Sequence, residues 1–213
     1  MSERRFGLEN SQSRAALLEA AEQLMREEGY AAVTSRAVAA RAGLKPQLVH
    51  YYFRTMDDLF LALLRRRAEQ NTERVKRALT GSDPLRAIWE LSSDAEIATL
   101  AAEFVALANH RKTIQAEIAR HTDEYRRAQV EVLSKVLEES GVDPQVWPLP
   151  AIVFLLEAAA RVLVMDNALG ISTGHAEMIG FVEEYLSVLK DARQKRKAKG
   201  DAAPAPVRRQ RRQ

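Results

Sequence analysis

The sequence predicts an all-α protein. Through most of the 213 residues, apolar side chains recur at spacings of three and four, which is the period of an amphipathic helix. No stretch alternates convincingly with a period of two, so no sheet is expected. Turn signals such as Gly81-Ser82-Asp83-Pro84 separate the helical stretches, because proline fits the first position of a helix and glycine favours the turn before it.

Residues 34–53 have the pattern of a helix-turn-helix. An apolar face on the first short helix is followed by Gly43, which can take a positive φ in a sharp turn. Pro46 then suits the start of a second helix, 46–53. In that helix Leu48 and Val49 can pack inward while polar residues face out. The sequence therefore predicts a DNA-binding unit with 46–53 as the recognition helix, braced by a helix over 11–28.

The outward residues have the chemistry that DNA contacts require. The Gln47 amide can read an adenine edge, and His50 can donate to a guanine. Phosphate contacts are expected from four further side chains, those of Thr34, Arg36, Lys45 and Tyr51. The hydroxyl of Thr34 or Ser35 should also cap the first short helix. Arg4 and Arg5 precede this unit in an arm, 1–10, that is either solvated or inserted in a minor groove.

This stretch resembles the N-terminal domain of TetR-family (tetracycline-repressor-like) transcriptional regulators. The resemblance rests on Thr34, Ala42-Gly43-Leu44, Tyr52-Phe53 and Asp57-Asp58-Leu59. It implies that Pro46, Gln47, His50 and Tyr51 face DNA. Two positions depart from the family pattern: Met56 replaces a lysine that commonly meets a phosphate, and Lys45 replaces a Ser or Thr that often caps the recognition helix.

Further helices are expected over 56–80, 84–92, from about 95 through Leu107, 111–139, 151–169 and 173–191. We expect a DNA-binding domain over 1–55 and a helical ligand-binding and dimerisation domain over 56–191. The segment 192–213 is predicted to be a disordered basic tail. It can serve solubility or contact DNA phosphates. Residues 190–213 hold ten basic and two acidic side chains, a net of +8, whereas the whole chain carries only +3.

The resemblance implies a ligand cavity in the second domain and dimerisation through its last two helices. Aromatic side chains on four predicted helices can line the cavity, and three polar side chains can orient a ligand: Trp89, Phe104, Tyr125 and Phe154, with Asn109, His110 and His121. His121 is more simply a hydrogen-bonded core histidine. Glu157 and Arg161 have the spacing of an ion pair. We expect the dimer interface to include Ala158, Arg161, Val162, Val182, Tyr185 and Leu189.

These features predict a ligand-responsive transcriptional regulator, commonly a repressor in the family. It would bind a palindromic operator as a homodimer and be released by a small, largely apolar effector. The alternative is a helical scaffold protein that recognises no DNA sequence. An enzyme is disfavoured because no nucleophile–base set or paired carboxylates can be named, and no cofactor or metal site is expected. The absence of cysteine, of a signal peptide and of a membrane span is consistent with the cytoplasm.

Overall fold

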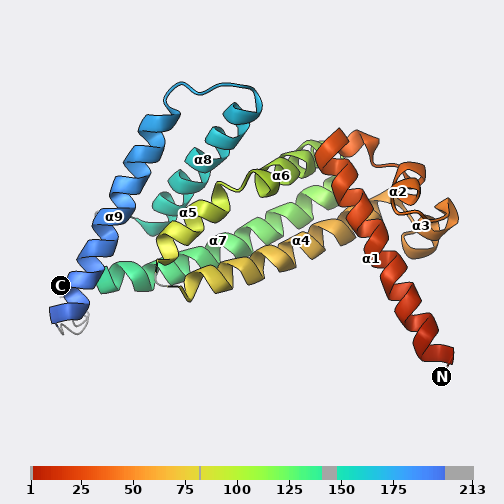
Figure 1. Ribbon diagram of the computed structural model, residues 1–213, viewed down its shortest axis with the longest axis horizontal. Helices are drawn as coiled ribbons and strands as arrows, with labels where there is room; N and C mark the ends of the chain where they lie inside the picture. The colour runs from red at the N-terminus through yellow and green to blue at the C-terminus, as the bar shows by residue number, and fades with distance from the viewer. Residues whose placement is uncertain (1, 82, 141–147, 200–213) are drawn as a thin grey trace, which may run out of the picture.

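The computed structural model describes residues 2–81, 83–140 and 148–199 (Figure 1). Within these ranges the chain forms α-helices and one short 3-10 helix, and no strand, which confirms the predicted all-α class. The elements are α1 (Ser2–Glu28), η1 (Tyr30–Ala32), α2 (Ser35–Arg41), α3 (Pro46–Tyr52), α4 (Met56–Leu79), α5 (Pro84–Ser92), α6 (Ala95–Ala108), α7 (Lys112–Ser140), α8 (Leu149–Ala168) and α9 (His175–Lys199).

We call α1 to α3 the head and α4 to α9 the body. The head is held together by an apolar core that α1, α2 and α3 share with the first half of α4. Leu17, Met25, Val38 and Leu59 are fully buried there. The same core continues into the body through Phe104 of α6 and other side chains of α6 and α7. The head therefore packs directly against the body through a continuous apolar core.

Helix α4 links the two parts and has a well-defined start. The Thr55 hydroxyl accepts a hydrogen bond from the Asp58 amide at 3.1 Å, and the Asp58 carboxylate accepts one from the Thr55 amide at 3.0 Å. This capping box satisfies two backbone donors that the first turn would leave unpaired. Asp57 and Asp58 also place negative charge at the positive end of the helix dipole.

A second apolar core fills the far end of the body. It joins α5, α7, α8 and α9 through side chains such as Ile88, Leu133, Ala160 and Leu186. In Figure 1, α4 and α7 lie side by side and run in the same direction between the two ends. Ion pairs between Asp57 and Arg111, and between Arg65 and Glu117, fix that parallel register.

Two helix ends differ from the predictions. Helix α1 begins at Ser2, so the expected N-terminal arm is helical, and α9 continues to Lys199, beyond the predicted end at Asp191. Residues 2–10 lack proline, and residues 192–199 are mostly basic residues and alanine with no proline or glycine, so nothing stops either helix. The stretch Gly141-Val142-Asp143-Pro144, whose composition favours a turn, and the rest of the tail, 200–213, lie outside the described residues. No helix within the described ranges is both long and apolar enough to span a membrane.

Candidate nucleic-acid interface and effector site

The helix-turn-helix is built as its sequence predicts. Thr34 caps α2 by accepting a hydrogen bond from the Ala37 amide at 3.2 Å. Gly43 has a φ of 66°, a left-handed conformation that glycine adopts without strain. Helix α3 begins at Pro46, and the side chain of its residue Val49 is buried. The turn and the buried anchor fix which side of α3 faces solvent.

The solvent side of α3 carries the predicted base-reading side chains. Gln47, His50 and Tyr51 are all exposed, and Tyr51 is 67% exposed with its ring edge-on to Tyr52 at 5.0 Å. Their spacing of three and four places them on one face of the helix. Thr34, Arg36, Lys45 and Pro46 are exposed around this face. Because the Thr34 oxygen accepts the capping bond, its hydrogen can still be donated to a phosphate.

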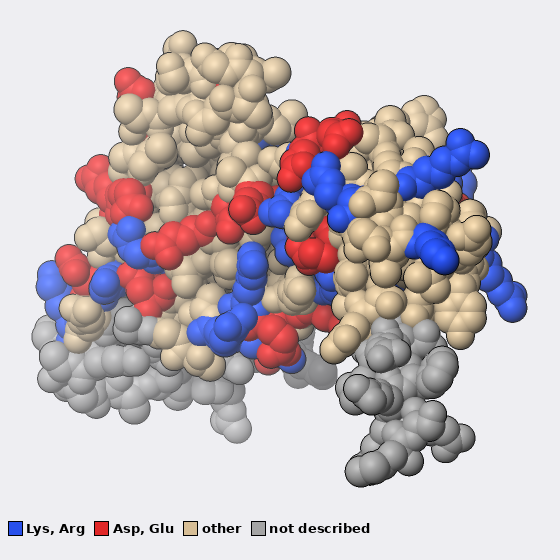
Figure 2. Space-filling view, turned by 45° about the vertical axis from the view of Figure 1, so that its right-hand side comes forward, with Lys and Arg blue, Asp and Glu red and all other residues tan. Residues whose placement is uncertain are grey.

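Not every basic side chain of the head is available to DNA. Arg41 at the end of α2 donates to Glu27 and Glu28 of α1 at 2.7 and 3.0 Å. Arg14 of α1 stacks over the Phe53 ring at 5.3 Å. Arg54, in the short connection between α3 and α4, is exposed and forms no ion pair within the described part of the chain. In Figure 2 several basic side chains project from the outer edge of the head.

The seven predicted ligand-pocket residues do not gather around one cavity. Phe104 lies in the core shared with the head, and Trp89 lies in the far core. Asn109 and His110 are exposed at the end of α6. Phe154 is 57% exposed and lies beneath the Arg126 guanidinium at 5.5 Å. Spacing along one helix shows which residues share a face, but not which neighbouring helix covers that face.

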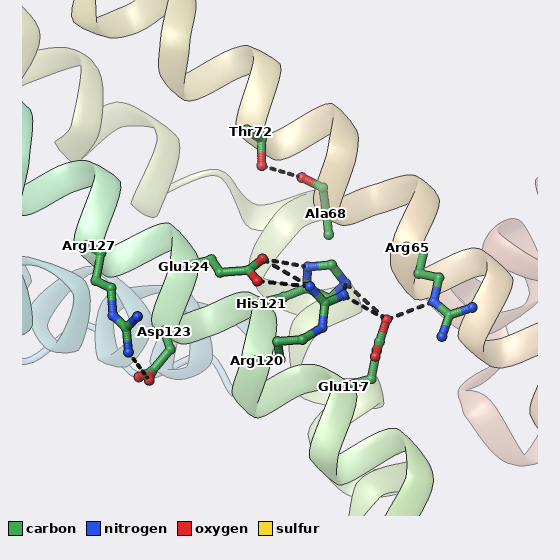
Figure 3. A network of polar contacts seen from close by, with 9 residues as sticks. All are labelled: Arg65, Ala68, Thr72, Glu117, Arg120, His121, Asp123, Glu124 and Arg127. Carbon is green, nitrogen blue, oxygen red and sulfur yellow. Dashed lines mark hydrogen bonds and ion pairs between the residues drawn. The ribbon is translucent and has the colours of Figure 1, made fainter.

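His121 lies in a polar network on the side of α7 (Figure 3). Its ring nitrogens are 3.3 Å from Glu117 and 3.8 Å from Glu124. Arg65 and Arg120 donate hydrogen bonds to the Glu117 carboxylate and lower its pKa from 4.5 to about 2. The interpretation of His121 as a core histidine is therefore wrong, because ionised groups surround it. These groups also fasten α7 to α4.

Three side chains of the body, which we call the polar layer, contain buried polar atoms without partners among the described residues. Gln129 of α7 is fully buried, and neither its amide oxygen nor its amide nitrogen has a hydrogen-bond partner among the described residues. The Asn71 amide oxygen of α4 and the Ser93 hydroxyl after α5 are buried and unpaired in the same way. Unpaired buried polar atoms are costly in a folded protein, so these three groups are candidates for ligand contacts.

Tyr125 borders this layer one turn before Gln129. Burial raises the pKa of its hydroxyl to about 12, and the nearby Glu157 charge adds to the effect. The Gln129 side chain opposes that shift, although the contact does not have the geometry of an ordinary hydrogen bond. Glu157 itself accepts a hydrogen bond from Arg126 at 2.9 Å, so the predicted pairing with Arg161 is replaced by a bond between helices. The layer thus offers uncharged donors and acceptors.

The sequence of the head matches a known protein family. Residues 17–63 match the model of a family described as "Bacterial regulatory proteins, tetR family", and the match spans the whole helix-turn-helix and the start of α4. The chain carries the DNA-binding domain of the TetR family. No curated protein matches the sequence at a significant level.

Solved structures share the fold beyond the TetR head. A TetR-family transcriptional regulator structure from Rhodococcus sp. superposes with a TM-score of 0.68 at 16% identity, over 84% of this chain and 99% of that one. A transcriptional regulator from Saccharomonospora viridis, solved in complex with choline, gives 0.68 at 19% identity over 83% and 96%. The fatty acid degradation regulator FadR from Bacillus halodurans gives 0.60 at 16% identity over 84% and 94%. The head and body together therefore have the fold of these regulators.

The two departures from the TetR pattern have visible consequences. Met56 is half-buried and packs against the core of the head, so it strengthens the junction with α4 in place of a phosphate contact. Lys45 starts α3 without any side-chain capping bond, as its chemistry requires. Arg54 was missed by the sequence analysis; it lies between α3 and α4, where helical spacing gives no information on its direction.

Helices α8 and α9 expose large apolar side chains. Those of α8 and of the residue that caps its end form a stripe at helical spacing, and α9 adds four more: Leu155, Val162, Met165 and Leu169, then Met178, Ile179, Phe181 and Val188. In Figure 2 the end of the body where α8 and α9 meet is almost free of charged side chains. A contiguous apolar face of this kind marks a surface that a partner covers.

The predicted dimer residues fall on this face only in part. Ala158 is half-exposed, and Arg161 and Val162 are exposed on α8. On α9, however, Val182 is 4% exposed and lies in the protein's own core, with Tyr185 packed beside it. Apolar residues occur on both faces of α9, so periodicity could not separate the inner from the outer stripe. The Leu189 side chain lies outside the described part.

Proposed function

We propose that this protein is a ligand-responsive transcriptional repressor that binds a near-palindromic operator as a homodimer. The observation that carries the DNA-binding part is the exposed face of α3, where Gln47, His50 and Tyr51 project from a helix-turn-helix of TetR type. Amide and imidazole groups suit base edges in the major groove, whereas the flanking Thr34, Arg36, Lys45 and Arg54 suit phosphates. Such a protein acts as a binding module in the cytoplasm and performs no catalysis.

The apolar face of α8 and α9 supports the homodimer. Val162 and Phe181 are 55% and 68% exposed in a single chain, and a second copy would remove them from water. The small Ala158 in the same stripe lets two α8 helices approach closely. A two-fold dimer would place two copies of α3 in successive major grooves, which predicts an operator with two inverted half-sites.

The buried polar layer supports an effector site in the body. A regulator of similar fold from Saccharomonospora viridis was solved with choline, so this fold holds a small organic molecule in at least one case. In the present chain, Gln129, Tyr125 and Asn71 would bind an uncharged polar group of the effector. The apolar cores of the body would contact its larger apolar part, which retains the expectation of a largely apolar molecule.

Effector binding can reach the head through α4. Gln129 and Tyr125 lie on α7, Asn71 lies on α4, and the two helices run side by side. An effector inserted between them would separate α4 from α7 and move the N-terminal end of α4, which lies beside the head and is capped by Thr55. The effector releases the operator only to the extent that it prefers the separated arrangement.

Binding to the DNA upstream of the protein's own gene tests this function. Fluorescence anisotropy with that promoter should show saturable binding that weakens steeply with salt, with a slope of about −0.9 for each phosphate contacted. A scrambled duplex should bind much more weakly. Equal affinity for both duplexes, or no binding at low salt, would favour the alternative of a helical scaffold protein.

A further inference from the structure

A cleft lined by arginines lies where α1 packs on α4 and α6. Its volume is about 430 Å³, and its wall includes five arginines but only three glutamates: Arg26, Arg66, Arg67, Arg74 and Arg77, against Glu19, Glu22 and Glu96. The wall therefore has an excess of two positive charges. Figure 2 shows basic and acidic side chains interleaved over the middle of the face drawn, between head and body.

The inner part of the wall is fixed by ion pairs. The Glu22 side chain is only 5% exposed, and its carboxylate oxygens lie 2.7 Å from Arg66 and 3.2 Å from Arg67. These two arginines are themselves 23% and 13% exposed. Glu22 thus holds two guanidinium groups of α4 in place, and Arg66 has a second partner in Glu19 at 3.1 Å. Guanidinium groups that are already ordered lose little entropy when they bind a ligand.

Several donors of the cleft are unused. Arg66 Nε is buried and has no hydrogen-bond partner in the described structure. Arg74 is half-buried and forms neither an ion pair nor a hydrogen bond with any described residue. Arg77 Nε donates to the Glu73 backbone oxygen at 3.2 Å, and its charge is one of those that lower the pKa of the Glu73 carboxyl. Arg74 is therefore a partly buried guanidinium group without a counter-charge among the described residues, which is a favourable position for an oxyanion.

We propose that this cleft binds a small molecule that carries two or more phosphate or carboxylate groups. Planar guanidinium groups bind both kinds of oxyanion in a bidentate manner, and several of them together favour a multiply charged ligand over a single ion. Operator DNA is not the expected occupant, because the base-reading face belongs to α3, which contributes no residue to the wall of the cleft. This cleft is also separate from the uncharged polar layer around Gln129.

The cleft lies at a contact between head and body. Arg26 of α1 pairs with Glu96 at the start of α6 at 2.8 Å. An anion that binds Arg26 together with Arg74 would compete with Glu96 and connect α1 to α4 instead. Its binding would therefore change the contact that orients the head. The anion would then change the affinity for the operator by the same factor by which the operator changes the affinity for the anion.

Calorimetric titration of the purified protein tests the proposal without DNA. Tripolyphosphate and citrate serve as phosphate and carboxylate probes, with chloride at the same ionic strength as the reference. We expect saturable binding of at least one probe, and the stronger probe identifies the ligand class. Arg74→Gln should weaken that binding by at least about tenfold, since it removes a charged donor. Arg127→Gln, which alters an exposed arginine of α7 outside the cleft, should leave it unchanged.

A second variant, Glu19→Gln, should strengthen anion binding instead of weakening it. Glu19 is 53% exposed and shares Arg66 with Glu22, so Glu19→Gln should leave the protein folded and tighten binding of the anion. Three results would overturn the proposal: no binding of either probe at millimolar concentration, equal weakening by Arg74→Gln and Arg127→Gln, or no tightening by Glu19→Gln. Because no DNA is present, each of these results would leave the proposed regulatory function standing.

Discussion

Glu22 of α1 and Arg66 of α4 form an ion pair of 2.7 Å across the contact between head and body. The carboxylate is 5% exposed and also lies 3.2 Å from Arg67. Glu22→Gln would leave two guanidinium groups facing a neutral amide in a poorly solvated place. We expect this change to reduce the free energy of unfolding by about 1–3 kcal/mol. Urea denaturation measures it.

Glu19 provides the matched control for that prediction. It contacts the same Arg66 at 3.1 Å but is 53% exposed, so water already screens the pair. Glu19→Gln should therefore change the free energy of unfolding by no more than about 0.5 kcal/mol. Equal effects of the two variants would show that burial of Glu22 has no energetic weight at this contact.

Gln129 should limit the stability of the protein without an effector. Its amide is fully buried and unpaired within the described structure. Gln129→Leu removes both polar atoms and keeps a similar volume, so we expect the free energy of unfolding to rise by about 1–2 kcal/mol. Gln115→Leu, at an exposed position of the same helix, is the control and should have little effect. A loss of stability in Gln129→Leu would mean that partners satisfy the amide.

The pKa of Glu117 predicts how acid affects stability. Arg65 and Arg120 lower this pKa from 4.5 to about 2, so folding favours the ionised form. The resulting stabilisation is complete above about pH 4.5 and is lost as the pH falls towards 2. The stability difference between wild type and Glu117→Gln should therefore shrink over that interval. Urea denaturation at several pH values measures it, and a difference that grows with acidity would contradict the assignment.

The apolar face of α8 and α9 predicts the oligomeric state. Wild type should sediment as a dimer, and Val162→Asp should shift it to monomers because a charge would be buried at the interface. Val105 on α6 is also about half exposed, at 49% against 55% for Val162, so Val105→Asp is a matched control that should remain dimeric. A monomeric wild type, or a dimeric Val162→Asp variant, would exclude this face as the interface.

The sequence was most informative where local chemistry decides the structure. Gly43, Pro46 and the capping residue Thr34 predicted the helix-turn-helix, because a turn and a cap depend on neighbouring residues. The breaks before Pro84 and after Ser92 were predicted for the same reason. The helix ends at Ser2 and Lys199 were not, since no residue there marks a stop.

Contacts between helices could not be predicted in this way. Arg65, Arg66 and Arg67 follow one another on α4, and nothing in their spacing shows that each pairs with a glutamate of another helix. Likewise, Phe104 and Trp89 belong to different cores although both lie on apolar helix faces. Which face meets which neighbour depends on the crossing of helices far apart in the chain. For this reason, the effector residues were harder to identify than the DNA-facing ones.

The central claim is that α3 reads the operator through Gln47 and His50. The operator can be selected from random duplexes with the wild-type protein. The most direct measurement is then the affinity of three variants for this operator: Gln47→Ala, His50→Ala and the control Gln115→Ala. Each α3 substitution should weaken specific binding by roughly 1–3 kcal/mol and leave binding to non-specific DNA nearly unchanged. The control should bind as wild type does. Unchanged operator affinity in both α3 variants would contradict the account.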